Sequence, residues 1–236
     1  MTSLKALFDS EPEIRRNALR RIAQIPAAWL FVGLVLFGSA GTLQLPSAWL
    51  FLGLLAAVDL IGLQFISLEV VAERGSKKAN VEPWDVKVGK LIVLSMLGIF
   101  LTAGLDHRWS WSQAMAPEIQ GASIVVFLLG CALEVWAMRV NRFFSDVVRL
   151  QFDKGHEVCS GGPYRFIRHP GYLGMIAYYL AVPILLGSSL AMIPAGMTVI
   201  LFVVRTHLED KTLLQKLPGY DEYANRVRFR LLPWIW

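Results

Sequence analysis

The residues best suited to chemistry lie in one polar stretch, residues 141–172, with the sequence NRFFSDVVRLQFDKGHEVCSGGPYRFIRHPGY. It combines charged, aromatic and imidazole side chains with two turn signals, GGP at 161–163 and PG at 170–171. Glycine lets backbone N–H groups approach a ligand closely, and proline breaks the course of the chain. We therefore expect a binding site for a polar ligand around these turns.

A second polar cluster begins with RTHLED at 205–210 and continues with PGYDEYANRV at 218–227. A helix that continues as far as Pro218 places Arg205 and Glu209 on one face, four residues apart. That spacing also fits a surface salt bridge of little energy. The arginines and tyrosines of both clusters also fit a role as anchors at a membrane surface, but their density favours a ligand site.

Membrane helices must position these clusters. Of the 236 residues, 55% are hydrophobic and 17% are charged, which is too apolar for an ordinary soluble domain. Apolar runs that approach the roughly 20 residues of a bilayer-spanning helix lie at 27–45, 48–68, 89–105, 119–138, 171–186 and 188–204. The sequence predicts an all-α polytopic membrane protein with about six transmembrane helices.

The basic residues give the orientation, because lysine and arginine collect in cytosolic loops. All of the 23 lysines and arginines except Arg108 fall on one side of the predicted spans. We predict a multi-pass protein of the cell inner membrane with both termini cytosolic and a cytosolic C-terminal site. The N-terminal segment lacks the pattern of a removable signal peptide.

The chain divides into three predicted regions. Residues 1–26 form a cytosolic interfacial helix, since Ile14, Ala18 and Ile22 share a face and the arginines lie largely off it. The alternative is that these charges only set the topology. Residues 27–138 form a four-span membrane region, and residues 139–236 hold two spans and both polar clusters. The net charge of +5 does not indicate nucleic acid, because no domain-sized soluble stretch presents a basic face. Cys131 and Cys159 predict neither a disulfide nor a metal site.

Two acidic residues, Asp59 and Glu134, fall inside predicted spans. An ionisable side chain there is costly and can mark a polar cavity. We expect instead that neighbouring helices satisfy both, and that Glu134 also lies near the cytosolic end of its span.

Three motifs, GPYRFIRHPGYLG at 162–174, RTHLED at 205–210 and YDEYANRV at 220–227, resemble in order and spacing the isoprenylcysteine carboxyl methyltransferase family and the related phospholipid N-methyltransferases. The resemblance covers residues 139–236 and implies a methyltransferase-like catalytic region that wraps S-adenosylmethionine. The resemblance, together with the charge of the side chains, implies a set of residues that contact this cofactor. They are His156, Glu157, Val158, Cys159, Tyr164, Arg168, His169, Pro170, Gly171, Tyr172, Glu209 and Asp210. Candidate catalytic residues are Arg205, toward the acceptor, with Glu209 and His169.

The chain departs from the family pattern after Arg205. The family usually has consecutive glutamates there, whereas this chain reads His207, Leu208, Glu209, Asp210. Which of the two carboxylates is functional is therefore open.

Methyl transfer from a sulfonium is an in-line displacement, so the protein must chiefly align donor and nucleophile and exclude water. A carboxylate acceptor needs only orientation, which Arg205 can supply. An amine or thiol acceptor needs a base, for which His169, His207 and Glu209 are candidates.

These considerations predict an integral-membrane S-adenosylmethionine-dependent methyltransferase acting on a membrane lipid or lipidated small-molecule acceptor, with carboxyl O-methylation favoured and no metal. One alternative is phospholipid N-methylation. Another is an NADPH-dependent membrane reductase of the sterol type, which has a similar helical architecture. A third is a scaffold or transporter with an inactive site.

Overall fold

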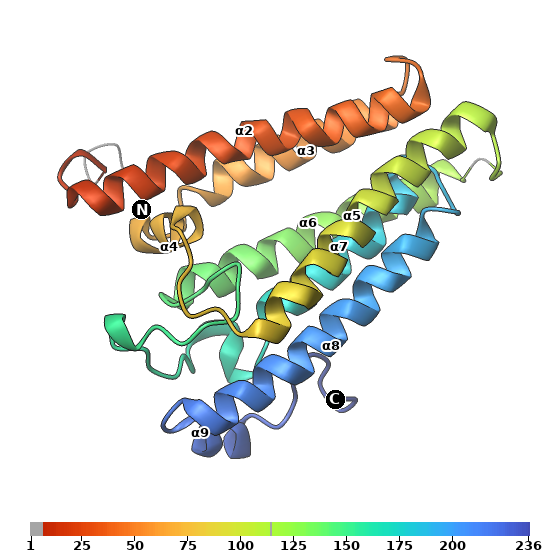
Figure 1. Ribbon diagram of the computed structural model, residues 1–236. Helices are drawn as coiled ribbons and strands as arrows, with labels where there is room; N and C mark the ends of the chain where they lie inside the picture. The colour runs from red at the N-terminus through yellow and green to blue at the C-terminus, as the bar shows by residue number, and fades with distance from the viewer. Residues whose placement is uncertain (1–6, 114) are drawn as a thin grey trace.

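The computed structural model describes residues 7–113 and 115–236. All regular elements in these ranges are helical, as predicted, and Figure 1 shows how they are arranged. They are α2 (Pro12–Ala40), α3 (Pro46–Gly62), α4 (Leu68–Gly75), α5 (Pro83–Trp109), α6 (Pro117–Val140), α7 (Pro170–Leu186), α8 (Met192–Lys216) and α9 (Tyr220–Arg226), with short 3₁₀ helices at Phe152–Lys154 and Gly162–Arg165.

Four of these helices, α2, α5, α6 and α8, are long and apolar enough to cross a membrane. Helices α3 and α7 are also apolar but have only 17 residues each. The chain is thus a multi-pass membrane protein, with four candidate spans and two shorter apolar helices where the sequence predicted about six spans.

Proline and glycine set most helix boundaries. Proline is the first residue of α2, α3, α5, α6 and α7, where its missing N–H costs nothing because the first N–H groups of a helix lack intrahelical partners. Gly187 ends α7 with φ of 80°, a left-handed conformation that glycine adopts without strain. The chain then turns directly into α8, which begins at Met192.

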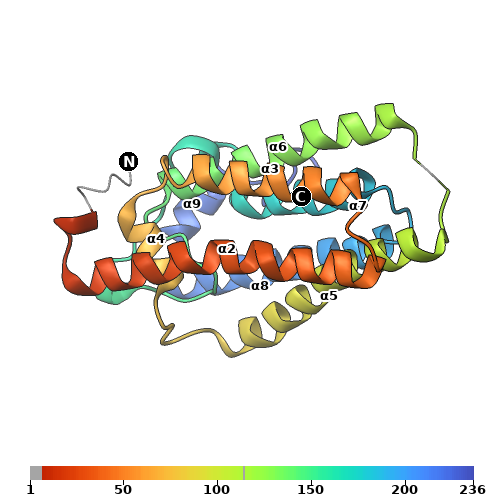
Figure 2. The ribbon, with the colours of Figure 1, turned by 90° about the horizontal axis from the view of Figure 1, so that it is seen from above.

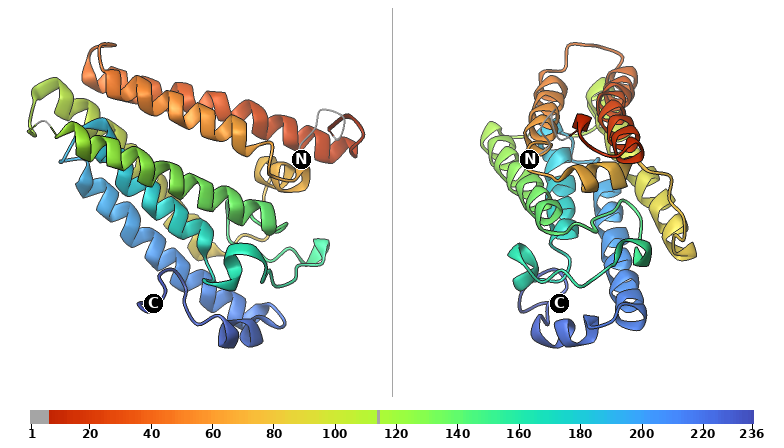
Figure 3. Two further views of the ribbon diagram at one scale, coloured as in Figure 1. Left: turned by 180° about the vertical axis from the view of Figure 1, so that it is seen from behind. Right: turned by 90° about the vertical axis from the view of Figure 1, so that its left-hand side faces the viewer.

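The helices separate the molecule into two ends. Helix α4, the segment 141–169 and α9 lie together at one end, which we call the site end (Figures 1 and 3). The α2–α3 and α5–α6 connections lie at the other end. Seen from above, α2 and α3 run beside each other over the remaining helices (Figure 2). The apolar core joins α2 and α3 to α5–α8 through residues such as Leu36, Phe51, Ile99 and Val182.

Helices α6 and α7 pack at very short range because two glycines face each other. A Cβ atom on Gly130 would lie 2.7 Å from the carbonyl oxygen of Gly174, and one on Gly174 would lie 2.9 Å from the backbone nitrogen of Glu134. Small residues at a helix crossing let the backbones approach closely in a membrane. This contact fixes α7, whose first turn carries the polar motif, against α6.

The predicted interfacial helix is not a separate element. Helix α2 runs without a break from Pro12 through Pro26 to Ala40, so residue 26 is not a boundary. The face predicted to lie on lipid packs inside the protein, with Ala18 fully buried and Ile14 and Ile22 against the cluster around α4. Helix α4 thus supplies an apolar partner for this face within the chain. Residues 1–6 lie outside the described residues.

We expect Gly174→Ala to destabilise the protein. The added methyl group must push α7 away from α6, and overpacking of this kind typically costs about 1–3 kcal/mol. The matched control is Gly196→Ala in α8, where a Cβ atom meets nothing within 4 Å and alanine favours the helix. Thermal unfolding in detergent should show a lower midpoint for the first variant only. Equal midpoints would contradict the close α6–α7 contact.

Candidate active site

A cavity, here called the site cavity, opens at the site end between the segment 141–159, the first turns of α7 and the end of α8. The predicted cofactor residues among its lining are His156, Glu157, Val158, Cys159, Tyr164, Arg168, His169, Gly171, Tyr172 and Glu209. Pro170, Asp210 and Arg205 are not part of the lining. The structure therefore brings most of the predicted site together around one space.

Tyr172 connects the polar groups on one side of the site cavity. Its ring stacks on His169 with 5.8 Å between centroids and 4° between planes. Its hydroxyl donates a hydrogen bond to the carboxylate of Glu209. The guanidinium carbon of Arg205 lies 5.3 Å from the Tyr172 ring centroid, close enough for a cation–π contact.

Asp210 is fully buried and binds the groups around it instead of lining the cavity. Arg168 donates to both carboxylate oxygens, at 2.7 and 2.8 Å. Tyr220 and Arg230 donate at 2.9 and 2.8 Å, and His169 Nε2 lies 3.4 Å away. Asp210 thus joins α8 to the RH dipeptide before α7, to α9 and to the C-terminal segment.

This arrangement separates the two acidic candidates. Glu209 lines the site cavity and receives a hydrogen bond there from Tyr172, whereas the oxygens of Asp210 are occupied by protein donors. Arg168 does line the cavity, but Asp210 and the carbonyl oxygen of Val227, at 2.9 Å, take its donors. Arg165, the other arginine of the motif at 162–174, is exposed and outside the lining.

Arg205 lies behind the cavity wall. It donates to both oxygens of Asp85 in α5, at 2.8 and 3.1 Å, and to the carbonyl oxygen of Asp146 at 2.8 Å. Asp85 also accepts from the backbone N–H of Val148 at 2.8 Å. The pair therefore holds the segment 146–148 against α5 and α8. The surface salt bridge between Arg205 and Glu209 that the spacing allowed is replaced by this buried pair, whose members are 9% and 1% exposed at their side chains.

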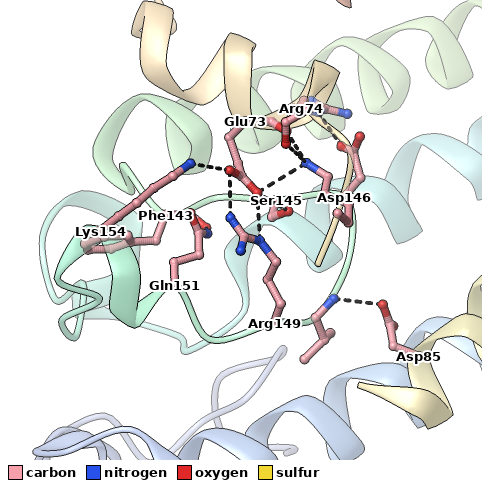
Figure 4. Close-up of polar contacts among 12 residues, drawn as sticks. Glu73, Arg74, Asp85, Phe143, Ser145, Asp146, Arg149, Gln151 and Lys154 are labelled. Carbon is pink, nitrogen blue, oxygen red and sulfur yellow. Dashed lines mark hydrogen bonds and ion pairs between the residues drawn. The ribbon is translucent and has the colours of Figure 1, made fainter. Parts of the chain in front are cut away.

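Glu73 of α4 ties down the other side of the same segment (Figure 4). It is 2% exposed and accepts from Nε and Nη2 of Arg149 at 3.0 and 2.9 Å, from Lys154 at 2.5 Å and from Ser145 at 3.2 Å. Since Ser145 and Arg149 also line the site cavity, this buried carboxylate positions part of the cavity wall.

Burial and neighbouring charges shift the pKa values of two groups at this cavity wall, Glu73 of α4 and His156. Burial disfavours the charged form of Glu73, but hydrogen bonds from Arg149 and Lys154 and the charge of Lys78 outweigh it and lower the pKa of its carboxyl to about 2. Burial and the nearby Arg149 charge lower the pKa of His156 to about 4. His156 is thus neutral near pH 7, and its Nδ1 accepts a hydrogen bond from the backbone N–H of Gln151 at 3.1 Å.

Sequence reasoning missed Glu73, Asp85 and Arg149. Asp85 offered a signal, because an acidic residue in the first turn of an apolar helix needs a partner. Glu73 and Arg149 offered a weaker signal, since each is a single charged residue in a segment that already holds several basic residues. The described ranges contain no group of three or more His, Cys, Asp or Glu residues that could hold a metal ion.

Comparisons with known proteins agree with these features. Residues 123–215 match the model of the isoprenylcysteine carboxyl methyltransferase (ICMT) family. The chain is 25% identical over 167 residues to a probable protein-S-isoprenylcysteine O-methyltransferase of Oryza sativa subsp. indica, covering 67% of this chain and 84% of that protein. It is 22% identical over 231 residues to the protein-S-isoprenylcysteine O-methyltransferase of Saccharomyces cerevisiae, covering 92% of each.

Among solved structures, the eukaryotic intramembrane Ras methyltransferase ICMT has a similar fold. The TM-score is 0.51 with 20% sequence identity, over 87% of this chain and 74% of that chain. This likeness supports the helical membrane fold.

We expect the Glu73 contacts to make stability depend on pH. The folded-state pKa of about 2 lies below the ordinary 4.5, so the stabilisation is present above pH 4.5 and is lost as pH falls toward 2. At about 1.4 kcal/mol per pKa unit, it amounts to about 3 kcal/mol. The free energy of unfolding of wild type minus that of Glu73→Gln, measured in detergent, should shrink over this range.

Glu69→Gln is the control, because Glu69 lies exposed on the same helix. Its difference from wild type should be small at every pH. His156 also lowers the stability of both proteins as pH falls from 6.5 to 4, because its imidazole binds a proton more readily in the unfolded chain than in the folded one. A difference between wild type and Glu73→Gln that is flat from pH 7 to 2 would contradict the assigned contacts.

Proposed function

The chain belongs to the isoprenylcysteine carboxyl methyltransferase family, and on that premise we propose that it uses S-adenosylmethionine to O-methylate the carboxylate of a lipid-like acceptor. The supporting observation is that most of the predicted cofactor residues line one cavity at the end of a membrane helix bundle, all except Pro170 and Asp210. The relatives are named O-methyltransferases, so neither a sterol-type reductase nor a phospholipid N-methyltransferase is favoured.

The side chains of the site cavity fit the charges of S-adenosylmethionine. Glu209 has a carboxylate in the lining, which suits the cofactor's ammonium or ribose. The aromatic rings of Tyr164 and Tyr172 also line the cavity, and ring faces attract cations. Asp210 suits a supporting role, because its oxygens already bind protein donors.

The site cavity holds about 100 Å³, whereas small-molecule sites usually hold roughly 300–1,000 Å³. A nucleoside-sized cofactor would therefore have to widen the site cavity as it binds.

Bound S-adenosylmethionine supplies a methyl group on a positively charged sulfur. A carboxylate acceptor is already a nucleophile, so the O–CH₃ bond forms as the S–CH₃ bond breaks and no proton must be removed. The chain therefore needs groups that orient and exclude water, not a dedicated base. Arg205 acts through Tyr172 and the segment 146–148, which makes it a positioning residue in this proposal.

We also propose that the site end faces the cytosol in a cell inner membrane, with both termini on that side. The distribution of arginine and lysine supports this orientation, since all except Arg108 belong to segments at or near the site end. Within this topology residues 139–236 carry the catalytic region and residues 27–138 the four preceding membrane helices.

Cofactor identity is tested by titrating the purified protein with S-adenosylmethionine and NADPH side by side. We expect heat of binding for S-adenosylmethionine and none for NADPH. Binding of NADPH alone would contradict the proposed function.

The two neighbouring carboxylates should respond differently to loss of charge. Glu209→Gln keeps an oxygen that can accept from Tyr172, so we expect normal stability and cofactor affinity weakened about tenfold, the worth of about 1.4 kcal/mol in a charge-assisted contact. Asp210→Asn leaves the buried Arg168 without its counter-ion, which typically costs about 3–5 kcal/mol of stability.

Calorimetry and thermal unfolding of each variant separate these effects. Glu222→Gln, at an exposed position on α9, is the control and should change neither quantity. Unchanged cofactor affinity in Glu209→Gln, with a fully folded protein, would contradict the placement of the cofactor's cationic part at Glu209.

A further inference from the structure

Residues 230–236 fold into a compact loop, here called the C-terminal loop. The backbone oxygen of Trp236 accepts from the backbone N–H groups of Arg230 and Leu231, at 2.9 and 3.1 Å. The guanidinium carbon of Arg230 also lies 5.0 Å from the centroid of the Trp236 ring. These contacts close the loop on itself and give it a defined inner and outer side.

The outer side of the C-terminal loop is apolar. Leu231 is buried, whereas Leu232, Trp234 and Ile235 are exposed. At 88% and 77%, Trp234 and Ile235 are the most exposed large hydrophobic side chains among the described residues. Trp234 has φ of 63°, a left-handed conformation that a bulky residue rarely adopts. The backbone thus holds two large apolar side chains away from the protein.

The length of α7 places this loop near the membrane surface. Helix α7 joins α8 at the end of the molecule opposite to the site end. Its 17 residues make it roughly 25 Å long, whereas the hydrocarbon core of a bilayer is about 30 Å thick. The first turn of α7 therefore lies at the depth of the lipid headgroups and not far beyond them.

The chain before the C-terminal loop pairs with the residues that directly precede α7. The backbone N–H groups of Arg168 and His169 donate to the carbonyl oxygens of Phe229 and Arg230, each at 2.9 Å. Figures 1 and 3 show the chain returning from α9 to end beside α8. The C-terminal loop thus shares the depth of the first turn of α7.

The two paired segments are basic. Residues 165–169 and 228–236 contain four arginines and no acidic residue. Two of these arginines bind the buried Asp210. The other two, Arg165 and Arg228, are exposed, and neither forms an ion pair within the described ranges. Their charge is therefore free for an anionic partner.

Exposed apolar and basic side chains come together here. Phe166, next to Arg165, is 65% exposed. Tryptophan favours the headgroup level of a membrane, and arginine is attracted there by anionic lipid. An exposed apolar patch with a polar rim marks an interaction site. The group here called the loop patch consists of Arg165, Phe166, Arg228, Leu232, Trp234 and Ile235.

The segment that carries the loop patch also holds part of the site. The guanidinium group of Arg168 donates to the backbone oxygens of Val227 and Arg228, at 2.9 and 3.2 Å. Arg168 and His169 both line the site cavity. A surface that binds the ordered form of residues 227–236 therefore also favours the ordered form of these two residues.

We propose that the loop patch docks on the anionic headgroup layer of the surrounding bilayer, and that this contact holds Arg168 and His169 in place at the site cavity. The apolar side chains enter the boundary between headgroups and acyl chains, and the two free arginines pair with lipid phosphate. The bilayer is the partner already present at this depth. The effect on cofactor affinity rests on the proposed function, whereas the docking does not.

Lipid contact is tested by quenching of tryptophan fluorescence. The full-length protein is placed in nanodiscs that contain phosphatidylglycerol, with acyl chains either unbrominated or brominated near the headgroup. The difference in fluorescence between wild type and Trp234→Phe gives the contribution of Trp234. Bromine quenches at short range, so we expect most of this contribution to be lost in brominated discs. Equal contributions in both kinds of disc would overturn the proposal.

The role of charge is tested by hydrogen exchange of the full-length protein in nanodiscs of phosphatidylcholine with and without phosphatidylglycerol. We expect the amides of the C-terminal loop, and those of Arg168 and His169, to exchange about fivefold more slowly with the anionic lipid, as for one arginine near such a surface. The double variant Arg165→Gln, Arg228→Gln should lose this difference.

The matched control is the double variant Arg16→Gln, Arg20→Gln, which removes the same charge from exposed positions on α2 and should keep the difference. Wild-type exchange that ignores phosphatidylglycerol would refute docking on anionic lipid. Slower exchange in the loop alone would refute the link to Arg168 and His169.

Titration with S-adenosylmethionine in the same discs separates this proposal from the proposed function. We expect a lower dissociation constant in the anionic discs for wild type and no such gain for the variant without Arg165 and Arg228. If the loop responds to lipid but S-adenosylmethionine binds in neither disc, the proposed function fails and the docking stands. If the cofactor binds equally in both discs, the coupling is wrong.

Discussion

The buried carboxylate of Asp210 is the interaction on which the rest of the site depends. It holds Arg168 and Arg230 and lies beside His169 and Tyr220, which come from three separate parts of the C-terminal region. A buried charge pair adds little net stability, but removal of one partner leaves an unpaired charge that the interior cannot solvate. The pairing therefore makes one arrangement of the motif before α7 far more favourable than the alternatives.

The N-terminal half of the chain contributes to the same site through two further carboxylates. Asp85 in α5 binds Arg205 and the backbone of Val148, and Glu73 in α4 binds Arg149. These contacts hold the wall of the site cavity to helices that precede the catalytic motifs. The membrane helices of the first half thus act as more than anchors, since they position the segment that must admit the cofactor and exclude water.

The sequence revealed those parts of the site that are contiguous in the chain. The motif at 162–174 combines turn residues with ligand-binding side chains, and composition alone predicted the helical membrane fold. The division of roles between Glu209 and Asp210 could not be predicted, because neighbouring residues point roughly 100° apart on a helix and the rotation of α8 depends on tertiary packing. Glu73 and Asp85 escaped notice because their partners lie more than 60 residues away along the chain.

The central claim, carboxyl methylation of a membrane-partitioning acceptor, is tested most directly by the chemistry of the product. Purified protein is incubated with a membrane lipid extract and S-adenosylmethionine labelled in its methyl group, and the lipid fraction is then treated with mild base. A methyl ester releases labelled methanol under these conditions, whereas a methylated amine keeps its label. The account predicts label in the lipid fraction that is released by base and that falls in the Glu209→Gln variant. Label that resists base, or no label above a protein-free control, would contradict it.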